Sequence, residues 1–150
     1  MINIHIQEAD FDHSELYNGL RSANTPPGAV VTFTGLVRDF SSHGDVQAIY
    51  LEHYPAMTEK TLHKIAVTAQ ERWQLENIVI VHRVGKITAR EQIVFVGVAS
   101  LHRKEAFQAC EYIMDYLKND APFWKKEITP THELWVENKK SDSEALDKWR

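Results

Sequence analysis

"EQIVFVGVASLHRKEAF", residues 91–107, is the stretch that decides the fold class. Residues 91–100 are almost continuously apolar, which is typical of a strand in the interior of a sheet. From about Arg103 the apolar residues follow helical spacing and share one face, which holds Ala106, Phe107, Cys110, Ile113, Met114 and Leu117. The sequence therefore predicts a buried strand that leads directly into a helix.

The surrounding sequence alternates hairpins with helical crossovers. Strands are predicted at 2–6, 29–38, 46–54, 77–85, 91–100, 123–129 and 132–137. Helices are predicted at 12–22, 55–73, from 103 onward and at 141–149. We expect strands 29–38 and 46–54 to pair antiparallel, with 39–45 as a loop between them. Residues 86–90 are expected to be a plain connection. This order predicts an α+β fold, a mostly antiparallel sheet with flanking helices.

The length and charge of the chain limit what it can bind. Its 150 residues suit a single domain, 1–150, in which 138–150 form a C-terminal tail. The net charge of −4 argues against a general surface for nucleic acid or for an anionic membrane. No apolar run resembles a signal peptide or a membrane span, so we expect a cytoplasmic protein. An anion site must then be a local cluster of basic residues.

The histidines and the cysteine do not form a metal motif. The eight histidines are scattered, and none pairs with another at the two-, three- or four-residue spacing of metal ligands. Cys110, the one cysteine, falls in the middle of a predicted helix and is interpreted as a small buried apolar residue. The sequence predicts no metal site.

Two basic groups stand at the ends of the third predicted helix. His102 and Arg103 lie at its start, where free N–H groups and the helix dipole attract anions. The alternative is that Ser100 caps this helix while His102 and Arg103 are merely solvated. Lys118 lies in the last turn, where the dipole alone also favours a cation.

The stretch "FWKKEI", 123–128, adds two more lysines to the same region. In a strand, Lys125 shares a face with Phe123 and Glu127, whereas Lys126 lies on the opposite face. One of the two is then held against a partly buried face, where a lysine pKa is easily displaced. The alternative is a pair of lysines whose stems cover apolar surface while their heads stay in water.

Several segments together carry a family resemblance. "GAVVTFTGLVRD", "LEHYPAMTEK", "VIVHRVGKI", "EQIVFVGVASLHR" and "EYIMDYLKNDAPFWKKE" resemble, in this order, the large catalytic subunits of molybdopterin synthase. The resemblance runs from about Gly28 to Glu137. It implies an α/β-hammerhead type of fold and a sulfurtransferase that needs no cofactor of its own.

The reaction implied by this resemblance converts cyclic pyranopterin monophosphate into molybdopterin by inserting two dithiolene sulfurs. Each sulfur would arrive as a thiocarboxylate on the C-terminal Gly-Gly of a small ubiquitin-like carrier subunit. Two large subunits would form a homodimer at the centre of a heterotetramer.

The resemblance also implies roles for single residues. Lys118 and Lys125 match the catalytic lysines, and the substrate-binding positions are Leu36, Val37, Arg38, His102, Arg103, Lys118, Lys125, Lys126 and Glu127. His102 and Arg103 would bind the substrate phosphate from the neighbouring chain of the dimer.

Two positions depart from the family pattern: Leu36 stands where some relatives have a lysine, and Lys139 lies where an arginine is frequent. The alternative function is a non-catalytic α+β module that binds a pterin or another anion for regulation. Such a module would release the pterin unchanged.

Overall fold

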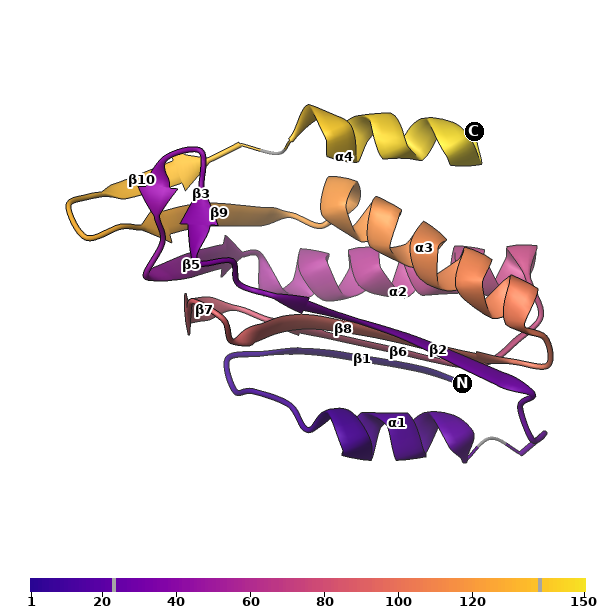
Figure 1. Cartoon of the computed structure of the whole chain (residues 1–150). Coiled ribbons are helices and arrows are strands. Elements are labelled where there is room, and N and C mark those ends of the chain that lie inside the picture. Colours follow the sequence, from indigo (N-terminus) through magenta and orange to yellow (C-terminus); the bar gives the residue numbers. More distant parts are fainter. Residues whose placement is uncertain (23, 138) are drawn as a thin grey trace.

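The computed structural model describes residues 1–22, 24–137 and 139–150. The first residue of the predicted tail, 138, lies outside the described residues. The elements follow one another as β1 (Ile2–Gln7), α1 (His13–Arg21), β2 (Ala29–Leu36), β3 (Phe40–Ser41), β4 (Gly44–Asp45), β5 (Ala48–His53), α2 (Pro55–Arg72), β6 (Leu75–Arg83), β7 (Gly85–Thr88), β8 (Gln92–Ser100), α3 (Arg103–Asp120), β9 (Phe123–Ile128), β10 (Glu133–Val136), α4 (Lys140–Ala145) and a 3₁₀ turn, η1 (Leu146–Trp149) (Figure 1). The predicted α+β class is confirmed.

The main sheet has the strand order β1-β6-β8-β2, and helices cover both of its faces (Figure 1). Residues of α2 and α3 pack on one face, against Ile78, Ile80, Val94, Val96 and Val98. On the other face Leu20 of α1 packs against Val79, Val81, Phe95 and Ala99. Because alternate side chains of β6 and β8 enter two different cores, both strands are apolar almost throughout.

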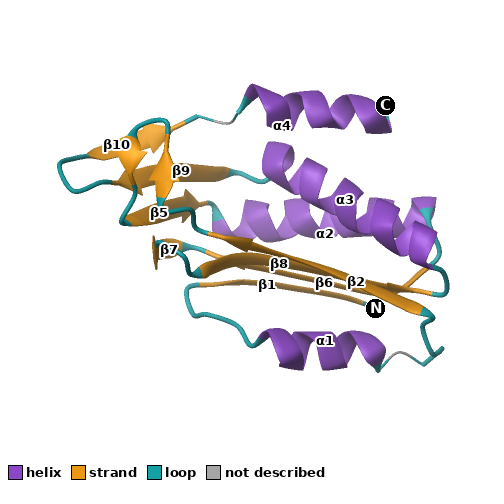
Figure 2. Cartoon of the chain, viewed as in Figure 1, coloured by secondary structure: helices purple, strands orange, loops and turns teal. Residues whose placement is uncertain are grey.

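A second sheet, with the order β10-β9-β5-β7, extends beyond one end of the main sheet (Figure 2). Val46, Ile49, Leu51 and Ile87 form a small core beneath it together with Val37. Among the described strands, β1 and β6 form the one parallel pair of the two larger sheets, and all their other pairs are antiparallel. The prediction of mostly antiparallel sheets is therefore confirmed.

Three local predictions were wrong. Strands 29–38 and 46–54 do not pair: β2 pairs with β8, whereas β5 lies in the second sheet between β7 and β9. The expected loop at 39–45 contains the β3–β4 hairpin, and the expected connection at 86–90 contains most of β7. The physical reason is that the Val46 N–H donates to the Asp39 carbonyl and closes the small hairpin, so the chain leaves one sheet before it enters the next.

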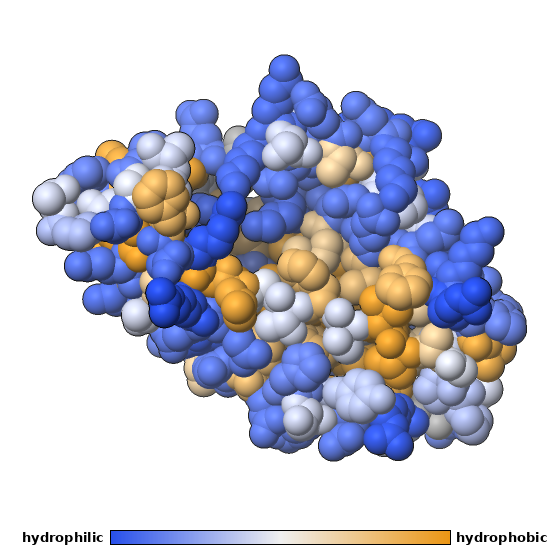
Figure 3. Space-filling view, in the orientation of Figure 1, coloured by the Kyte–Doolittle hydropathy of each residue, from blue (hydrophilic) through white to orange (hydrophobic). Residues whose placement is uncertain are grey.

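The face that carries the edge strand β2 has an apolar patch. Figure 3 shows apolar atoms across the middle of this face, with hydrophilic atoms above and below them. Large apolar side chains are exposed along β2 and at the start of α3, namely Phe33, Leu36, Leu101 and Phe107. An outermost strand beside exposed apolar side chains is a surface suited to contact with another chain.

Gly97 in β8 allows α1 to pack closely on the main sheet. A methyl group at this position would collide with the Leu20 side chain and lie 2.8 Å from the Phe95 ring. We predict that Gly97→Ala lowers the free energy of unfolding by about 1–3 kcal/mol, because both neighbours are fully buried and must shift. Chemical denaturation measures this free energy.

The matched control is Gly19→Ala, which meets nothing within 4 Å and should be neutral or stabilise α1 by up to about 1 kcal/mol. Equal stability of wild type and Gly97→Ala would contradict this packing.

Candidate active site

Lys125 in β9 lies at the centre of a group of positive charges. Burial is the main cause that lowers the pKa of its ammonium, and the charge of Lys118 lowers it further. Lys139 and Arg38 act in the same direction, whereas Glu127 opposes them. The structure thus brings four predicted site residues, Arg38, Lys118, Lys125 and Glu127, together with Lys139. Lys125 is more readily neutral than an ordinary lysine, so it is better able to act as a nucleophile or to exchange a proton.

The join between α3 and β9 sets the position of the two lysines. Lys118 lies in the last turn of α3, and the cap residue Ala121 returns its N–H to the Leu117 carbonyl. Pro122 follows, and the Phe123 N–H donates to the Ala121 carbonyl as β9 begins. The helix therefore ends within a few residues of Lys125. This turn is the one that "DYLKNDAPFWKKE" predicts.

Arg38 reaches the cluster from the end of β2. Val37 is buried, its N–H donates to the Glu91 carbonyl, and its own carbonyl accepts from the Arg90 N–H. Asp39 accepts two hydrogen bonds from the Arg90 guanidinium, at 3.0 and 2.9 Å. Both neighbours of Arg38 are thus fixed to the turn after β7. Val37 contributes to the site as a backbone anchor, whereas the Leu36 side chain is exposed.

Glu127 is buried beneath the β3–β4 hairpin. Its Oε1 accepts a hydrogen bond of 2.7 Å from the Ser41 hydroxyl and lies 3.3 Å from Nδ1 of His43. The carboxylate therefore ties the hairpin to β9 on the face that Lys125 also occupies. Sequence reasoning did not identify Ser41 or His43, because nothing in "DFSSHGD" indicates contact with a strand so far along the chain.

Lys126 lies on the opposite face of β9. Its ammonium is 5.5 Å from the ring centre of Tyr50 and 5.4 Å from that of Trp135, and it pairs with Glu133 at 3.5 Å. These partners hold Lys126 by cation–π and ionic contacts on the outer surface of the second sheet. Of the two adjacent lysines, the structure places Lys125 with the other cations and Lys126 apart from them.

His82 is a functional candidate that sequence reasoning missed. It is buried at the end of β6, its Nδ1 donates to the Arg83 carbonyl at 2.8 Å, and its ring stacks on Phe123 at 4.2 Å. Burial, with the charge of Lys118 as a smaller cause, lowers the pKa of His82 to about 4. A neutral ring thus supports the strand that carries Lys125. The signal was present: "VIVHRVG" places a histidine within an otherwise apolar strand.

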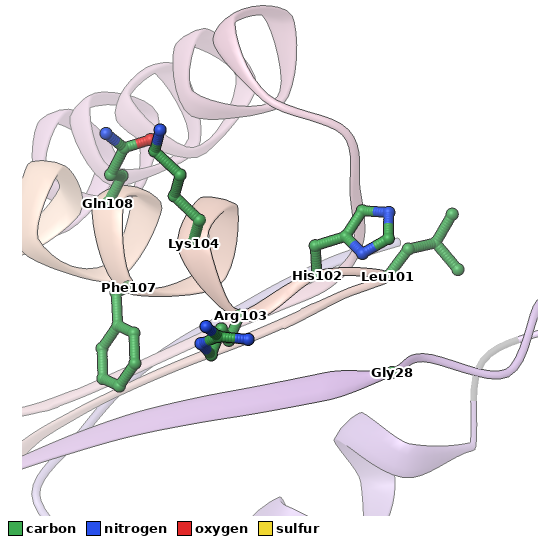
Figure 4. Close-up of a pocket in the computed structure, with 7 residues that line it drawn as sticks. All are labelled: Gly28, Leu101, His102, Arg103, Lys104, Phe107 and Gln108. Atoms are coloured by element: carbon green, nitrogen blue, oxygen red, sulfur yellow. The ribbon is translucent and has the colours of Figure 1, made fainter.

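His102 and Arg103 lie at the other end of α3. His102 is the cap residue, and its side chain makes no capping hydrogen bond within the described part of the chain. Ser100 does not cap the helix, because its hydroxyl donates to the Gln74 carbonyl at 2.8 Å. The exposed pair borders an open pocket of about 650 Å³ (Figure 4). Its lining comprises Gly28, Leu101, His102, Arg103, Lys104, Phe107 and Gln108.

A helical rise of about 1.5 Å per residue places Arg103 about 22 Å from Lys118 along the helix axis. One small substrate cannot contact both ends. The single chain therefore does not unite the two groups of candidate residues.

Cys110 is buried, as the sequence predicts. Its thiol lies 3.8 Å from the Val96 carbonyl, and burial raises its pKa to about 12. A thiol in this environment is unreactive.

Among residues 1–22, 24–137 and 139–150, no group of three or more His, Cys, Asp or Glu side chains is placed to hold a metal ion. None of the helices in these ranges is long and apolar enough to cross a membrane.

Comparisons with known proteins place these observations in a family. The model of the MoaE protein family matches residues 6–120. The chain is 51% identical over 146 residues to the molybdopterin synthase catalytic subunit of Pseudomonas aeruginosa, with 97% of each chain covered. The structure of the molybdopterin biosynthesis MoaE protein from Burkholderia ambifaria superposes with a TM-score of 0.85 at 48% identity, covering 99% of this chain and 98% of the other. A complex of subunits 1 and 2 of the molybdopterin-converting factor from Helicobacter pylori shares the fold, with a TM-score of 0.73, 20% identity and coverage of 92% and 91%.

His82 makes stability depend on pH. The unfolded chain binds a proton at the ordinary histidine pKa of about 6.5, whereas the folded chain does so only at about 4. The contribution of His82 to the free energy of unfolding is therefore fully present above about pH 6.5. It falls by about 3 kcal/mol as the pH drops to 4. We predict that His82→Asn flattens this part of the stability curve, measured by chemical denaturation at several pH values. His63→Asn, an exposed histidine on α2, is the control and should keep the wild-type slope. An unchanged slope in His82→Asn would show that another group controls the acid limb.

Proposed function

The chain belongs to the MoaE protein family of molybdopterin synthase catalytic subunits, and from this membership we propose that the Arg38–Lys118–Lys125–Lys139 cluster is its sulfur-transfer site. The substrate proposed for this site is cyclic pyranopterin monophosphate. Two sulfurs are inserted to form the dithiolene of molybdopterin. The observation that carries the proposal is the half-buried Lys125 among three further cations.

Electrostatics explains why this reaction needs such a cluster. The substrate carries a phosphate and the sulfur donor carries an ionised thiocarboxylate, so the two reactants repel each other. A group of fixed cations lowers this repulsion and holds both reactants close together. Since burial and neighbouring cations favour neutral Lys125, this residue can take part as a nucleophile or in proton transfer. Lys118, exposed at the helix end, remains available to the terminal carboxyl group of the donor.

The sulfur comes from a separate carrier in this proposal. Cys110, the one thiol of the chain, is buried and has a raised pKa, which argues against a sulfur donor within the chain. A small ubiquitin-like subunit that ends in a Gly-Gly thiocarboxylate meets the requirement, because glycine lets a backbone pass close to packed walls. The name "catalytic subunit" of the relatives and the two-subunit Helicobacter pylori complex support a partner of this kind.

A homodimer completes the site. β2 is one of the two edge strands of the main sheet, and its eight residues span about 26 Å, close to the 22 Å between Arg103 and Lys118. Gly28 and His102 lie at the start of β2, and Arg38 lies at its end. Two chains that meet antiparallel along β2 would therefore bring His102 and Arg103 of one to Lys118 and Lys125 of the other. The exposed apolar residues on this face support such a contact (Figure 3).

The two lysines give a direct test of the proposed activity. We predict that Lys118→Ala and Lys125→Ala each reduce dithiolene formation by about 100-fold or more, because each removes a charge that acts on the reacting groups. The assay combines the cyclic pterin, a thiocarboxylated carrier and each variant. Lys64→Ala, exposed on α2, is the control. A protein that binds the pterin and releases it unchanged would instead be the regulatory module. Full activity in both lysine variants would exclude this site.

Mixed dimers test the shared site. A chain with His102→Ala and Arg103→Ala lacks the phosphate end, and a chain with Lys118→Ala lacks the lysine end. Each homodimer should be inactive, whereas a mixed dimer should recover activity, because one of its two sites combines the two intact ends. We expect about half the activity per dimer, one intact site in two, measured after mixing and purification by two different tags. Mixed dimers without any recovered activity would show that each site lies within one chain.

A further inference from the structure

The C-terminal segment, residues 139–150, runs along α3 in the opposite direction. Near the end of α3, the Asn119 side chain donates to the Asp142 carbonyl at 2.6 Å. One turn earlier in the helix, Trp149 Nε1 donates to Asp115 at 2.7 Å. Lys148 pairs with Glu111 at 2.8 Å. In Figure 1, α4 accordingly lies beside α3, with the C-terminus toward the start of that helix.

Trp149 is the most firmly held residue of this segment. Its ring meets Trp73 and Tyr112 edge-on, at 5.8 and 5.4 Å between ring centres. The Arg72 guanidinium lies 5.6 Å from the Trp149 ring centre and donates to the Trp149 carbonyl at 3.3 Å. Leu146 is buried on the same side. Aromatic and cation–π contacts of a partly buried ring hold a segment more firmly than an exposed ion pair does.

Lys139 stands at the other end of the segment, immediately before α4. Its side chain is exposed, and it follows closely after Val136 of β10, which pairs with Lys125 of β9. Its charge lowers the pKa of Lys125 together with those of Lys118 and Arg38. An exposed lysine has a flexible stem, and its charge acts at a defined place only where its backbone is fixed. The backbone after Lys139 is fixed by Asn119 through Asp142 and, farther along, by Trp149.

We propose that Trp149 is a positioning residue, which anchors the C-terminal segment on α3 and so holds the Lys139 ammonium in the basic cluster with Lys118 and Lys125. The inference rests on the proposed function for the meaning of that cluster as a sulfur-transfer site. The placement of Lys139 itself is a statement about the folded chain alone. Trp149 acts through Lys139 and touches none of the reacting groups.

The titration of Lys125 reports the position of Lys139 without substrate or carrier. The charged groups that act on Lys125 are Lys118 from α3, Glu127 from β9, Arg38 after β2 and Lys139. A neighbouring positive charge lowers the pKa of Lys125, so withdrawing the Lys139 charge must raise it. The measurement is the pH dependence of acetylation of Lys125 by acetic anhydride, read by peptide mass spectrometry against exposed Lys64.

A double-mutant cycle tests whether Trp149 affects the titration of Lys125 through Lys139. We expect Lys139→Ala and Trp149→Ala each to raise the pH at which Lys125 is half acetylated, and the double variant to add nothing to Lys139→Ala alone. Trp149→Phe keeps a smaller aromatic ring at this position and loses the bond to Asp115, so its shift should be smaller than that of Trp149→Ala. It also serves if Trp149→Ala unfolds. Arg150→Ala, which removes an exposed cation that pairs with Asp147 within the same segment, is the matched control and should leave the midpoint unchanged.

Four results would overturn the proposal. An unchanged midpoint in Lys139→Ala would show that this charge does not reach Lys125. A shift in Lys139→Ala with none in folded Trp149→Ala would show that Lys139 is held without the anchor. Additive shifts, or a shift in Arg150→Ala equal to that in Trp149→Ala, would show that Trp149 acts by another route. None of these results depends on turnover, so a failure here is distinct from a failure of the proposed sulfur transfer.

Discussion

Burial of β8 on both faces is the constraint on which the rest of the structure depends. Phe95 and Ala99 enter the core beneath α1, while Val94, Val96 and Val98 enter the core beneath α2 and α3. β8 also lies between β6 and β2, so its backbone is paired along both edges. A strand that is packed on both faces and hydrogen-bonded along both edges can occupy only one position in the fold. α3 follows it directly, and the direction of that helix is therefore set where β8 ends.

The length and direction of α3 determine where the residues of the proposed site lie. His102 and Arg103 stand at its start and Lys118 at its end, and a helix of 18 residues cannot bring its two ends together. The same helix carries Asp115 and Asn119, to which the C-terminal segment is bonded. The lysine end of the site is consequently built from segments far apart in sequence: the end of β2, the end of α3, β9 and the residues just before α4. α3 contacts β2 and α4, and it leads directly into β9.

Sequence reasoning reached the elements and most of the basic cluster for a physical reason. The apolar runs of β6 and β8 and the helical periodicity of α3 are local patterns, and Lys118, Pro122 and Lys125 lie within one short stretch. The pairing of strands is not local. Sequence adjacency favoured a hairpin between β2 and β5, but the short β3–β4 hairpin between them directs the chain into another sheet. The contacts of Glu127 with Ser41 and His43 follow from that non-local pairing, so no pattern in the sequence contains them.

The opposing effects on Lys125 show why the cluster needs several elements. Burial alone already favours the neutral amine, and the cations around it add to that effect, while Glu127 works against both. Each of these groups is held independently: Arg38 by the residues bonded to Arg90, Glu127 by Ser41 and His43, and the tail by Trp149. Like charges held close together cost free energy in the folded protein, and they stay together because each is anchored by packing on its own element. An anionic ligand would remove that cost on binding, so at the proposed site this repulsion would become affinity for the phosphate and the thiocarboxylate of the proposed reactants. The strength of this affinity depends on how rigidly the anchors hold the charges, because a cation free to move into solvent would relieve the repulsion before any ligand arrived.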